Sequence, residues 1–163
     1  MINRQLSQSC SCPCGESTFD VHTKPLARFY CHCLICQNLY QKPFADFTIM
    51  LSSNVSLHDA SKIKFDRFRR PPALRRGICI TCKQPAIGFL RLAPFIQLAF
   101  VASSHYPDAS LLPPPQAHIF YHRRETDIHD ELPKHMGYLK SEWAVVTKMT
   151  AAITAGLWKH SLE

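Results

Sequence analysis

Alternation of polar and apolar residues over much of the chain predicts β-strands. Side chains on a strand point to opposite faces in turn, so a period of two indicates a strand that is buried on one face. Such alternation, or a short apolar run bounded by turn residues, occurs at 16–21, 44–51, 62–68, 86–92, 95–102 and 117–122. We therefore expect a mainly β protein.

A different period appears near the C-terminus and predicts a helix. Apolar residues spaced by three and four positions lie on one helix face. They are Val146, Met149, Ile153 and Leu157. We expect an amphipathic α-helix over about 141–160 with Ser141 as its N-cap, and packing roles for Trp143 and Trp158. Its apolar face would pack on the sheet of the same chain or, alternatively, form a homodimer contact.

The composition is that of a folded chain. Of 163 residues, 46% are hydrophobic and 19% are charged, which supplies the apolar surface needed to offset the entropy of ordering. Twelve prolines against five glycines argue against a helical bundle, because proline ends helices. The length predicts a single domain, over residues 12–163, and residues 1–11 are interpreted as a flexible leader.

Hydropathy predicts a soluble protein. The first residues lack the unbroken apolar run of a signal peptide. The most apolar stretch, 86–102, is interrupted by Arg91, Pro94 and Gln97, so it does not resemble a membrane span. We expect a cytoplasmic location and no membrane partner.

The net charge is basic, at +7 with a pI near 9.1. The densest basic cluster consists of Arg67, Arg69, Arg70, Arg75 and Arg76. We interpret it as a solvated face, with a site for an acidic small molecule as the alternative. We do not expect nucleic acid as a partner, because no aromatic-rich stacking motif accompanies the arginines.

Eight cysteines carry the strongest chemical signal. They form three clusters: Cys10, Cys12 and Cys14; Cys31, Cys33 and Cys36; and Cys79 and Cys82. In a reducing cytosol, clustered cysteines are better explained as metal ligands than as disulfides. A C-x-x-C turn directs two sulfurs to one tetrahedral ion, and a second pair completes a closed site. We therefore predict a structural zinc site made by Cys12, Cys14, Cys79 and Cys82.

The segment CHCLIC predicts a second zinc site of another kind. Cys31, Cys33 and Cys36 supply three thiolates within six residues, and no further cysteine pair remains to close the site. An open fourth position is typical of catalytic zinc, and a substrate thiol bound there would be held as a thiolate. We expect the ring of His32 to point away from the ion or to make a hydrogen bond behind it.

Cysteines can also take roles other than that of a zinc ligand. Cys10 is interpreted as a free surface thiol in the leader, or as a ligand that exchanges with Cys12. A disulfide framework and an iron site are the remaining alternatives.

Three cysteine motifs, in order, give the chain a resemblance to a known family. Cys12–Gly15 reads C-x-C-G, Cys31–Cys36 reads C-H-C-x-x-C, and Arg76–Cys82 ends in C-x-x-C. A weaker similarity to the same family is found in the segment HIFYHRRETDIHDELP. Over about residues 10–138 the chain resembles the glutathione-dependent formaldehyde-activating enzymes, a family that also includes centromere protein V.

This resemblance implies a β-tent-like fold, two zinc ions per chain and a carbon–sulfur lyase activity. The substrates would be a small thiol, glutathione or similar, and an aldehyde adduct such as S-hydroxymethylglutathione. Arg75 or Arg76 is predicted to pair with an acidic group of the substrate, a task that suits the arginine fork. The alternative is a non-catalytic, zinc-stabilised interaction module that binds an acidic partner.

Two positions depart from the family pattern. Gln41 and Lys83 stand near the places where the family usually has glycine after its cysteine turns. Larger side chains there would narrow the approach to the metal sites or change its charge. The thiol bound by this chain therefore need not be glutathione.

Overall fold

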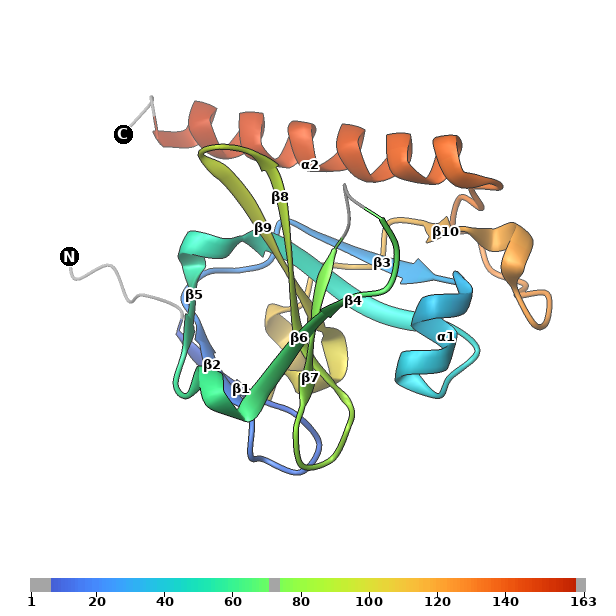
Figure 1. The fold of residues 1–163 in the computed structure, drawn as a ribbon. Coiled ribbons are helices and arrows are strands. Elements are labelled where there is room, and N and C mark those ends of the chain that lie inside the picture. Colours follow the sequence, from blue (N-terminus) through green and yellow to red (C-terminus); the bar gives the residue numbers. More distant parts are fainter. Residues whose placement is uncertain (1–6, 71–73, 161–163) are drawn as a thin grey trace. The chain divides into compact units, whose positions relative to one another are not determined.

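The computed structural model describes residues 7–70 and 74–160 (Figure 1). The chain divides into two compact units, which are described separately. Unit 1 comprises Met1–Pro25 and Phe47–Leu112, and unit 2 comprises Leu26–Asp46 and Pro113–Glu163. The expectation of a single domain over residues 12–163 stays a prediction.

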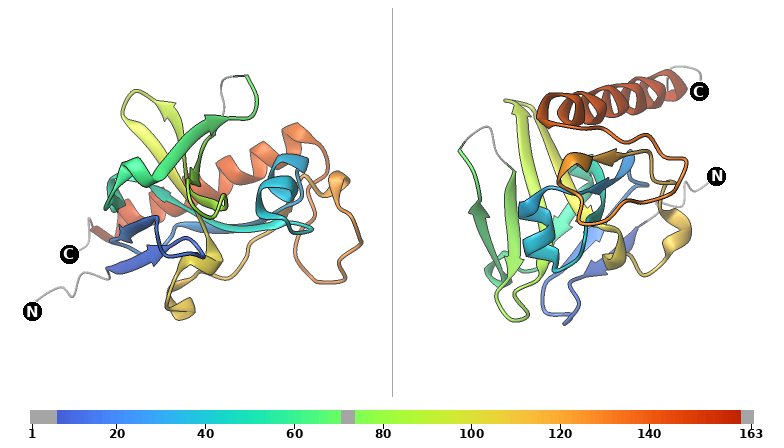
Figure 2. Two further views of the ribbon diagram at one scale, coloured as in Figure 1. Left: turned by 60° about the horizontal axis from the view of Figure 1, so that its bottom comes forward. Right: turned by 90° about the vertical axis from the view of Figure 1, so that its right-hand side faces the viewer.

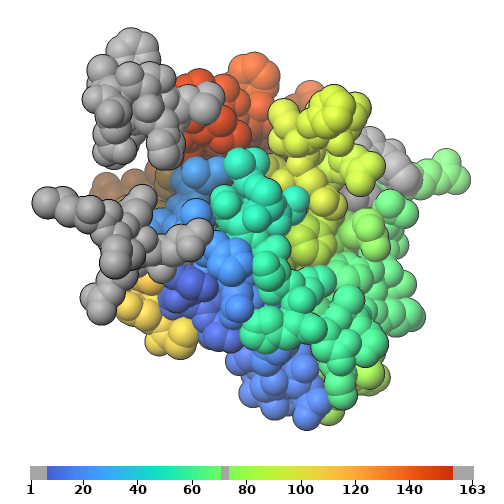
Figure 3. All heavy atoms as spheres, turned by 90° about the vertical axis from the view of Figure 1, so that its left-hand side faces the viewer, coloured from blue at the N-terminus to red at the C-terminus, as the bar shows by residue number. Residues whose placement is uncertain are grey.

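Unit 1 contains a small antiparallel sheet. In spatial order its strands are β1 (Gln8–Ser11), β2 (Thr18–Val21) and β5 (Val55–Leu57). Phe19 on the central strand lies opposite Cys10 on one side and Leu57 on the other. The 3-10 turn η1 (Ser52–Asn54) leads into β5, and the space-filling view shows this green-blue segment beside the blue strands (Figure 3).

A second set of strands in unit 1 pairs antiparallel. Its spatial order is β4 (Ala45–Leu51), β9 (Ile96–Ala102), β8 (Pro85–Ala93), β7 (Arg75–Cys79) and β6 (Ile63–Arg67). The yellow-green hairpin of β8 and β9 is visible from two sides in Figure 2. Gly77 on β7 has no room for a side chain, because a Cβ there would lie 2.6 Å from Ile63 and 2.7 Å from the Ile87 carbonyl. This close fit fixes the position of β7, the strand that ends at Cys79.

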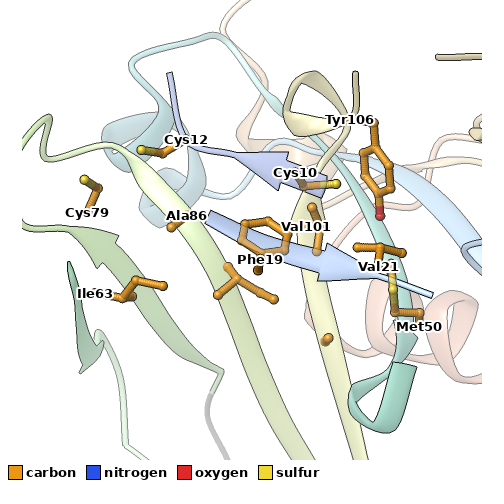
Figure 4. Packing of buried hydrophobic residues seen from close by; sticks show 12 residues of the cluster. Cys10, Cys12, Phe19, Val21, Met50, Ile63, Cys79, Ala86, Val101 and Tyr106 are labelled. Atoms are coloured by element: carbon orange, nitrogen blue, oxygen red, sulfur yellow. The ribbon is translucent and has the colours of Figure 1, made fainter. Parts of the chain in front are cut away.

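The core of unit 1 lies between these strands (Figure 4). Phe19 and Val21 from β2 pack with Met50 from β4 and Val101 from β9, and all four side chains are essentially fully buried. Burial of a side chain of this size stabilises the fold by about 1.5–3 kcal/mol. Cys10, Cys12 and Cys79 belong to the same cluster, so the cysteine turns are anchored in the core.

The expected leader is partly wrong. Residues 1–6 lie outside the described part of the chain, but Gln8–Ser11 form β1. Cys10 is not the surface thiol that we expected, because its side chain is fully buried in the core. Burial, together with the nearby charge of Asp20, raises the pKa of the Cys10 thiol to about 12. This cysteine is therefore a small apolar core residue at neutral pH.

Unit 2 combines two short strands with two helices. Its elements are β3 (Ala27–Cys31), α1 (Leu34–Tyr40), β10 (His118–Ile119), the 3-10 turn η5 (Tyr121–Arg123) and α2 (Tyr138–His160). β10 pairs parallel with β3, with Ile119 opposite Cys31. The expected strand over 117–122 is shorter than predicted, because Phe120 turns the chain with a φ of 53°. The protein is thus mainly β, with a C-terminal helix.

The C-terminal helix exists but its details differ from the expectation. It begins at Tyr138, so Ser141 lies inside the first turn and is not the N-cap. Met149 is buried as predicted, whereas Val146 is exposed and Ala144 is buried in its place. Trp143 is 69% exposed, which contradicts its predicted packing role. The side chains of Leu157 and Trp158 lie outside the described part of the chain.

Among the described residues, no helix combines the length and the apolar character that crossing a bilayer requires.

Candidate metal centres

Four cysteines of unit 1 converge on one point. Cys12 and Cys14 flank the turn that follows β1, Cys79 ends β7, and Cys82 lies in the next turn. Their sulfur atoms all lie within 4.8 Å of one another. The Sγ atoms of Cys12 and Cys14 are 3.4 Å apart, and those of Cys14 and Cys79 are 3.7 Å apart. In Figure 4, Cys12 lies just after the end of β1 and Cys79 lies at the end of β7.

These distances suit a tetrahedral metal ion. Four sulfurs about 2.3 Å from zinc lie about 3.8 Å from one another, whereas two sulfurs of a disulfide are about 2 Å apart. All eight cysteines are free. The alternative of a disulfide framework is therefore wrong, and this four-cysteine group could hold a metal ion.

Hydrogen bonds from nearby residues stabilise the thiolate form in the four-cysteine group. The Ser17 N–H donates a hydrogen bond to Cys12 Sγ at 3.4 Å. Burial alone would raise the pKa of Cys79, but hydrogen bonds from Ser17 and from the backbone of Cys82 and Thr81 outweigh it and lower the pKa to about 6. Donors that stabilise a thiolate favour metal binding, because zinc takes cysteine in its deprotonated form.

Three cysteines of unit 2 form a second group. Cys31 ends β3, Cys33 is the N-cap of α1, and Cys36 lies in the first turn of that helix. The Cys36 N–H donates to Cys33 Sγ at 3.4 Å, which fixes the sulfur at the helix start. All three sulfurs lie within 4.8 Å of one another, so this group could also hold a metal ion.

Among the side chains that the structure describes, the three-cysteine group has no fourth member: no further His, Cys, Asp or Glu brings a ligand atom within the same 4.8 Å. Hydrogen bonds with the sulfurs of Cys33 and Cys36, together with burial of Cys31, raise the pKa of the Cys31 thiol well above its usual value. A bound divalent cation reverses this effect, because it stabilises all three thiolates together.

His32 lies between two of these cysteines in the chain and is 1% exposed. Its Nε2 atom hydrogen-bonds to Nδ1 of His118 at 2.8 Å. His118 Nε2 in turn contacts Asp130 Oδ2 at 2.8 Å. Burial, followed by the charges of His118 and Arg124, lowers the pKa of His32 to about 4. The ring thus makes a hydrogen bond, which was one of the two expected arrangements, but its partners were not foreseen from the sequence.

Gln37 holds the same region together. It is buried in α1, and its Nε2 donates to the carbonyl oxygens of His32 and Arg123, each at 2.8 Å. The side chain thereby joins the end of β3, the start of α1 and the turn η5. His118 and Asp130 both lie in the segment HIFYHRRETDIHDELP, whose similarity to the family was visible in the sequence. Their spacing along the chain gave no indication that hydrogen bonds link them to His32.

The two arginines predicted to bind substrate lie on β7 in unit 1. Arg75 is exposed, and its guanidinium lies 5.3 Å from the ring centroid of Phe65. Arg76 is half-buried and lies opposite Asp66 on β6. The three-cysteine group belongs to unit 2, so a role of Arg75 or Arg76 at that group stays a prediction.

Comparisons with known proteins identify the family of this chain. A search of curated proteins finds no match. The family model described as glutathione-dependent formaldehyde-activating enzyme matches residues 7–123, a segment that contains both cysteine groups, His32 and His118. The match spans well over half of the chain, so the protein belongs to the family of glutathione-dependent formaldehyde-activating enzymes.

Proposed function

We propose that the protein is a zinc-dependent carbon–sulfur lyase with a β-tent-like fold. Its substrates are a small thiol, glutathione or similar, and an aldehyde adduct such as S-hydroxymethylglutathione. One observation carries the proposal: Cys31, Cys33 and Cys36 gather three sulfurs, and the described part of the chain adds no fourth ligand to them. Three protein ligands with one free position are typical of catalytic zinc.

The four-cysteine group supports a different role for its ion. Cys12, Cys14, Cys79 and Cys82 supply a complete tetrahedral set, which is typical of structural zinc. Cys14 and Cys79 are 65 positions apart in sequence, so an ion here joins distant segments of unit 1. Metal binding of this kind contributes directly to the stability of the fold.

A zinc ion held by Cys31, Cys33 and Cys36 would supply an open position at which a substrate thiol could be held as its thiolate. In the synthetic direction the thiolate sulfur forms a bond with the carbonyl carbon of formaldehyde, the carbonyl π-bond breaks, and its oxygen takes up one proton. The product is the hydroxymethyl thioether. In the lyase direction the hydroxyl proton leaves, the carbon–sulfur bond breaks, and the thiolate and the aldehyde separate.

Arg75 and Arg76 are proposed to bind the acidic end of the thiol. Guanidinium groups recognise carboxylates through two parallel hydrogen bonds, and glutathione carries two carboxylates. Arg75 is exposed and stands directly opposite Arg67 across the β6–β7 pair. Two cations at this spacing favour an anionic ligand, because like charges opposite each other are destabilising.

The proposal is tested by turnover of S-hydroxymethylglutathione, followed as release of formaldehyde. Cys33→Ser should lower kcat/KM by more than about 100-fold, because it removes a proposed zinc ligand directly, whereas loss of an outer partner costs about 10–100-fold. Cys10→Ala is the matched control, since Cys10 lies in the core outside both metal groups. Equal turnover by Cys33→Ser and the unmodified protein would contradict the proposal.

An interaction module is the second candidate, and the Arg67–Arg75 pair is the observation that favours it. In that case both metal groups are structural, and the arginines of the β6–β7 hairpin meet an acidic partner. Affinity for duplex DNA that falls steeply with salt, together with no turnover of any thiol adduct, would support the module. Turnover without salt-dependent DNA binding would support the enzyme.

A homodimer through α2 is also proposed. Leu139, Trp143 and Val146 are spaced as one helix face, and they are 82%, 69% and 47% exposed. Exposed apolar stripes are typical of surfaces that bind another protein molecule. Sedimentation of the unmodified protein and of Trp143→Glu would test this, with a dimer for the former and a monomer for the latter. A monomer in both cases would contradict it.

A further inference from the structure

Unit 2 contains a continuous chain of hydrogen-bonded side chains that begins at its surface and ends in its interior. Lys134 Nζ donates to Asp130 Oδ1 at 2.7 Å, and Asp130 Oδ2 lies 2.8 Å from His118 Nε2. His118 Nδ1 then lies 2.8 Å from His32 Nε2. His118 and His32 are 0% and 1% exposed, so the chain carries polar contacts to two fully buried rings.

The chemistry of these groups sets the direction of each hydrogen bond. The Asp130 carboxylate only accepts, because Lys134 binds it as an ion pair. His118 must therefore donate from Nε2. When both rings are neutral, each imidazole carries one N–H, so His118 Nδ1 is then an acceptor and receives the Nε2–H of His32. The Nδ1 atom of His32 is consequently left as an unprotonated lone pair.

The His32 ring is held in this orientation from several sides. Phe44 and Tyr121 pack against it with ring centroids 5.2 and 5.1 Å away, and Tyr121 meets it edge-on. Gln37 binds the carbonyl oxygen of the same residue. The ring therefore cannot turn freely to exchange its two nitrogens.

His32 Nδ1 is buried and has no hydrogen-bond partner within the described part of the chain. Buried polar atoms in folded proteins are almost always paired, so an unpaired one indicates a partner that the chain itself does not supply. The atom is not a fourth metal ligand, because His32 does not join the three-cysteine group. Its covalent neighbours Cys31 and Cys33 both belong to that group.

We infer that Asp130 and His118 are positioning residues which fix the tautomer of His32, and that its bare Nδ1 accepts a hydrogen bond from the hydroxyl group of a thiol–aldehyde adduct. The second half of this inference rests on the proposed function, and the first half does not. An O–H donor is what distinguishes the adduct from the free thiol and the free aldehyde. His32 thus favours the adduct over either component.

Nitrogen NMR of the zinc-loaded protein with ¹⁵N-labelled histidine tests the tautomer at about pH 8, where imidazole is ordinarily neutral. We expect an unprotonated Nδ1 and a protonated Nε2 for His32, with a scalar coupling across the hydrogen bond to His118 Nδ1. In Asp130→Asn, Lys134 holds the amide oxygen, so the amide N–H₂ faces His118 and both tautomers reverse. The kcat/KM of this variant should fall by about 10–100-fold with unchanged zinc content.

Asp127→Asn is the matched control, because Asp127 lies in the same loop and pairs with Arg124 at the surface. It should leave the His32 tautomer unchanged. A protonated Nδ1 in the unmodified protein would overturn the positioning role, even if Asp130→Asn does not fold. An Asp130→Asn protein with the original tautomer would overturn it as well.

The adduct is tested separately by adding glutathione and formaldehyde. The His32 Nδ1 resonance of the unmodified protein should shift with the adduct and remain in place with glutathione alone. If calorimetry shows that the adduct binds while this resonance stays fixed, the hydrogen bond to the adduct is refuted. Absence of any adduct binding would refute that hydrogen bond together with the proposed function, but would leave the tautomer result standing.

Discussion

Ser141 Oγ accepts a hydrogen bond from the backbone N–H of Phe120 at 2.8 Å. The bond joins the first turn of α2 to the residue that directly follows β10. Phe120 has a φ of 53°, a conformation that costs about 1–2 kcal/mol for a residue with a side chain. Ser141 therefore helps to hold a strained turn beside His118, a role that differs from the helix cap expected from the sequence.

Replacing Ser141 by alanine should destabilise the protein by about 1–3 kcal/mol, because the partly buried Phe120 N–H loses its acceptor. Ser141 is fully buried and also donates to the Gly137 carbonyl oxygen at 2.6 Å. Urea unfolding followed by circular dichroism measures the change. Thr147→Ala in the same helix is the control, and this exposed site should change the free energy of unfolding by less than about 0.5 kcal/mol. Equal stability of Ser141→Ala and the control would contradict the role of this bond.

Glycine at position 41 or 83 should stabilise the protein. Gln41 and Lys83 have φ values of 50° and 60°, in the left-handed region that glycine adopts without strain. We expect Gln41→Gly and Lys83→Gly each to raise the free energy of unfolding by about 0.5–1 kcal/mol, after the greater chain entropy of glycine is subtracted.

Lys42→Gly is the matched control for these glycine variants. Lys42 is exposed and is not among the positive-φ residues, so glycine there should destabilise the protein slightly. If all three glycine variants lost stability alike in thermal unfolding, the backbone strain at positions 41 and 83 would be refuted.

The same two positions show what the sequence could reveal. Both stand where the family usually has glycine, and the departure was visible in the sequence. From the sequence alone, this departure indicates a change in substrate access, whereas the structure shows a backbone conformation that favours glycine. The φ angle of a turn depends on how the chain closes around its cysteines, and composition does not report it.

Strand prediction succeeded where a period of two was clear, as at Ala45–Leu51 and Ile96–Ala102. It missed Ala27–Cys31 and Arg75–Cys79, because each strand ends in a cysteine turn whose signal hid the alternation. It also missed Leu34–Tyr40, since seven residues are too short for a helical period to be recognised. Its start depends on capping by Cys33, which was interpreted only as a metal ligand.

Both cysteine groups were predicted from spacing, because a turn of two intervening residues constrains the sulfurs locally. The chain from Asp130 through His118 to His32 was not. His32 and His118 are 86 positions apart, and the parallel pairing of β10 with β3 that unites them has no local sequence signal. Long-range pairing of this kind becomes visible only in the folded chain.

Loss of one cysteine should have opposite consequences in the two groups. Cys82→Ser should unfold unit 1, because the four-cysteine group joins segments 65 positions apart. Cys33→Ser should lose one zinc ion per chain and remain folded, because its group spans only six residues. Metal analysis and circular dichroism of both variants decide, and unfolding of both would refute this division of roles.

Stability at low pH should depend on Asp130. A hydrogen bond from Lys134 and a weaker one from His118 lower the pKa of this carboxyl group to about 2 from an ordinary value of 3.8. A lowered pKa means that the carboxylate stabilises the folded state above about pH 4 and loses this effect as the pH falls towards about 2. Asp130→Asn should therefore differ from the unmodified protein at about pH 5 and converge with it near pH 2.

The difference between the two proteins is the quantity to measure, because protonation of the zinc-binding thiolates affects both alike. Thermal unfolding at a series of pH values provides it. A difference that is independent of pH over this window would show that Asp130 is not held as a carboxylate by Lys134 and His118.

X-ray absorption at the zinc edge measures the sulfur atoms around each ion and tests whether the three-cysteine group keeps a free position. With one closed and one open site, the protein alone should show an average of about 3.5 sulfurs per zinc, rising to about 4 when glutathione is added. An average of about 4 before any thiol is added, or one that glutathione leaves unchanged at two zinc ions per chain, would contradict the proposed chemistry at Cys31, Cys33 and Cys36.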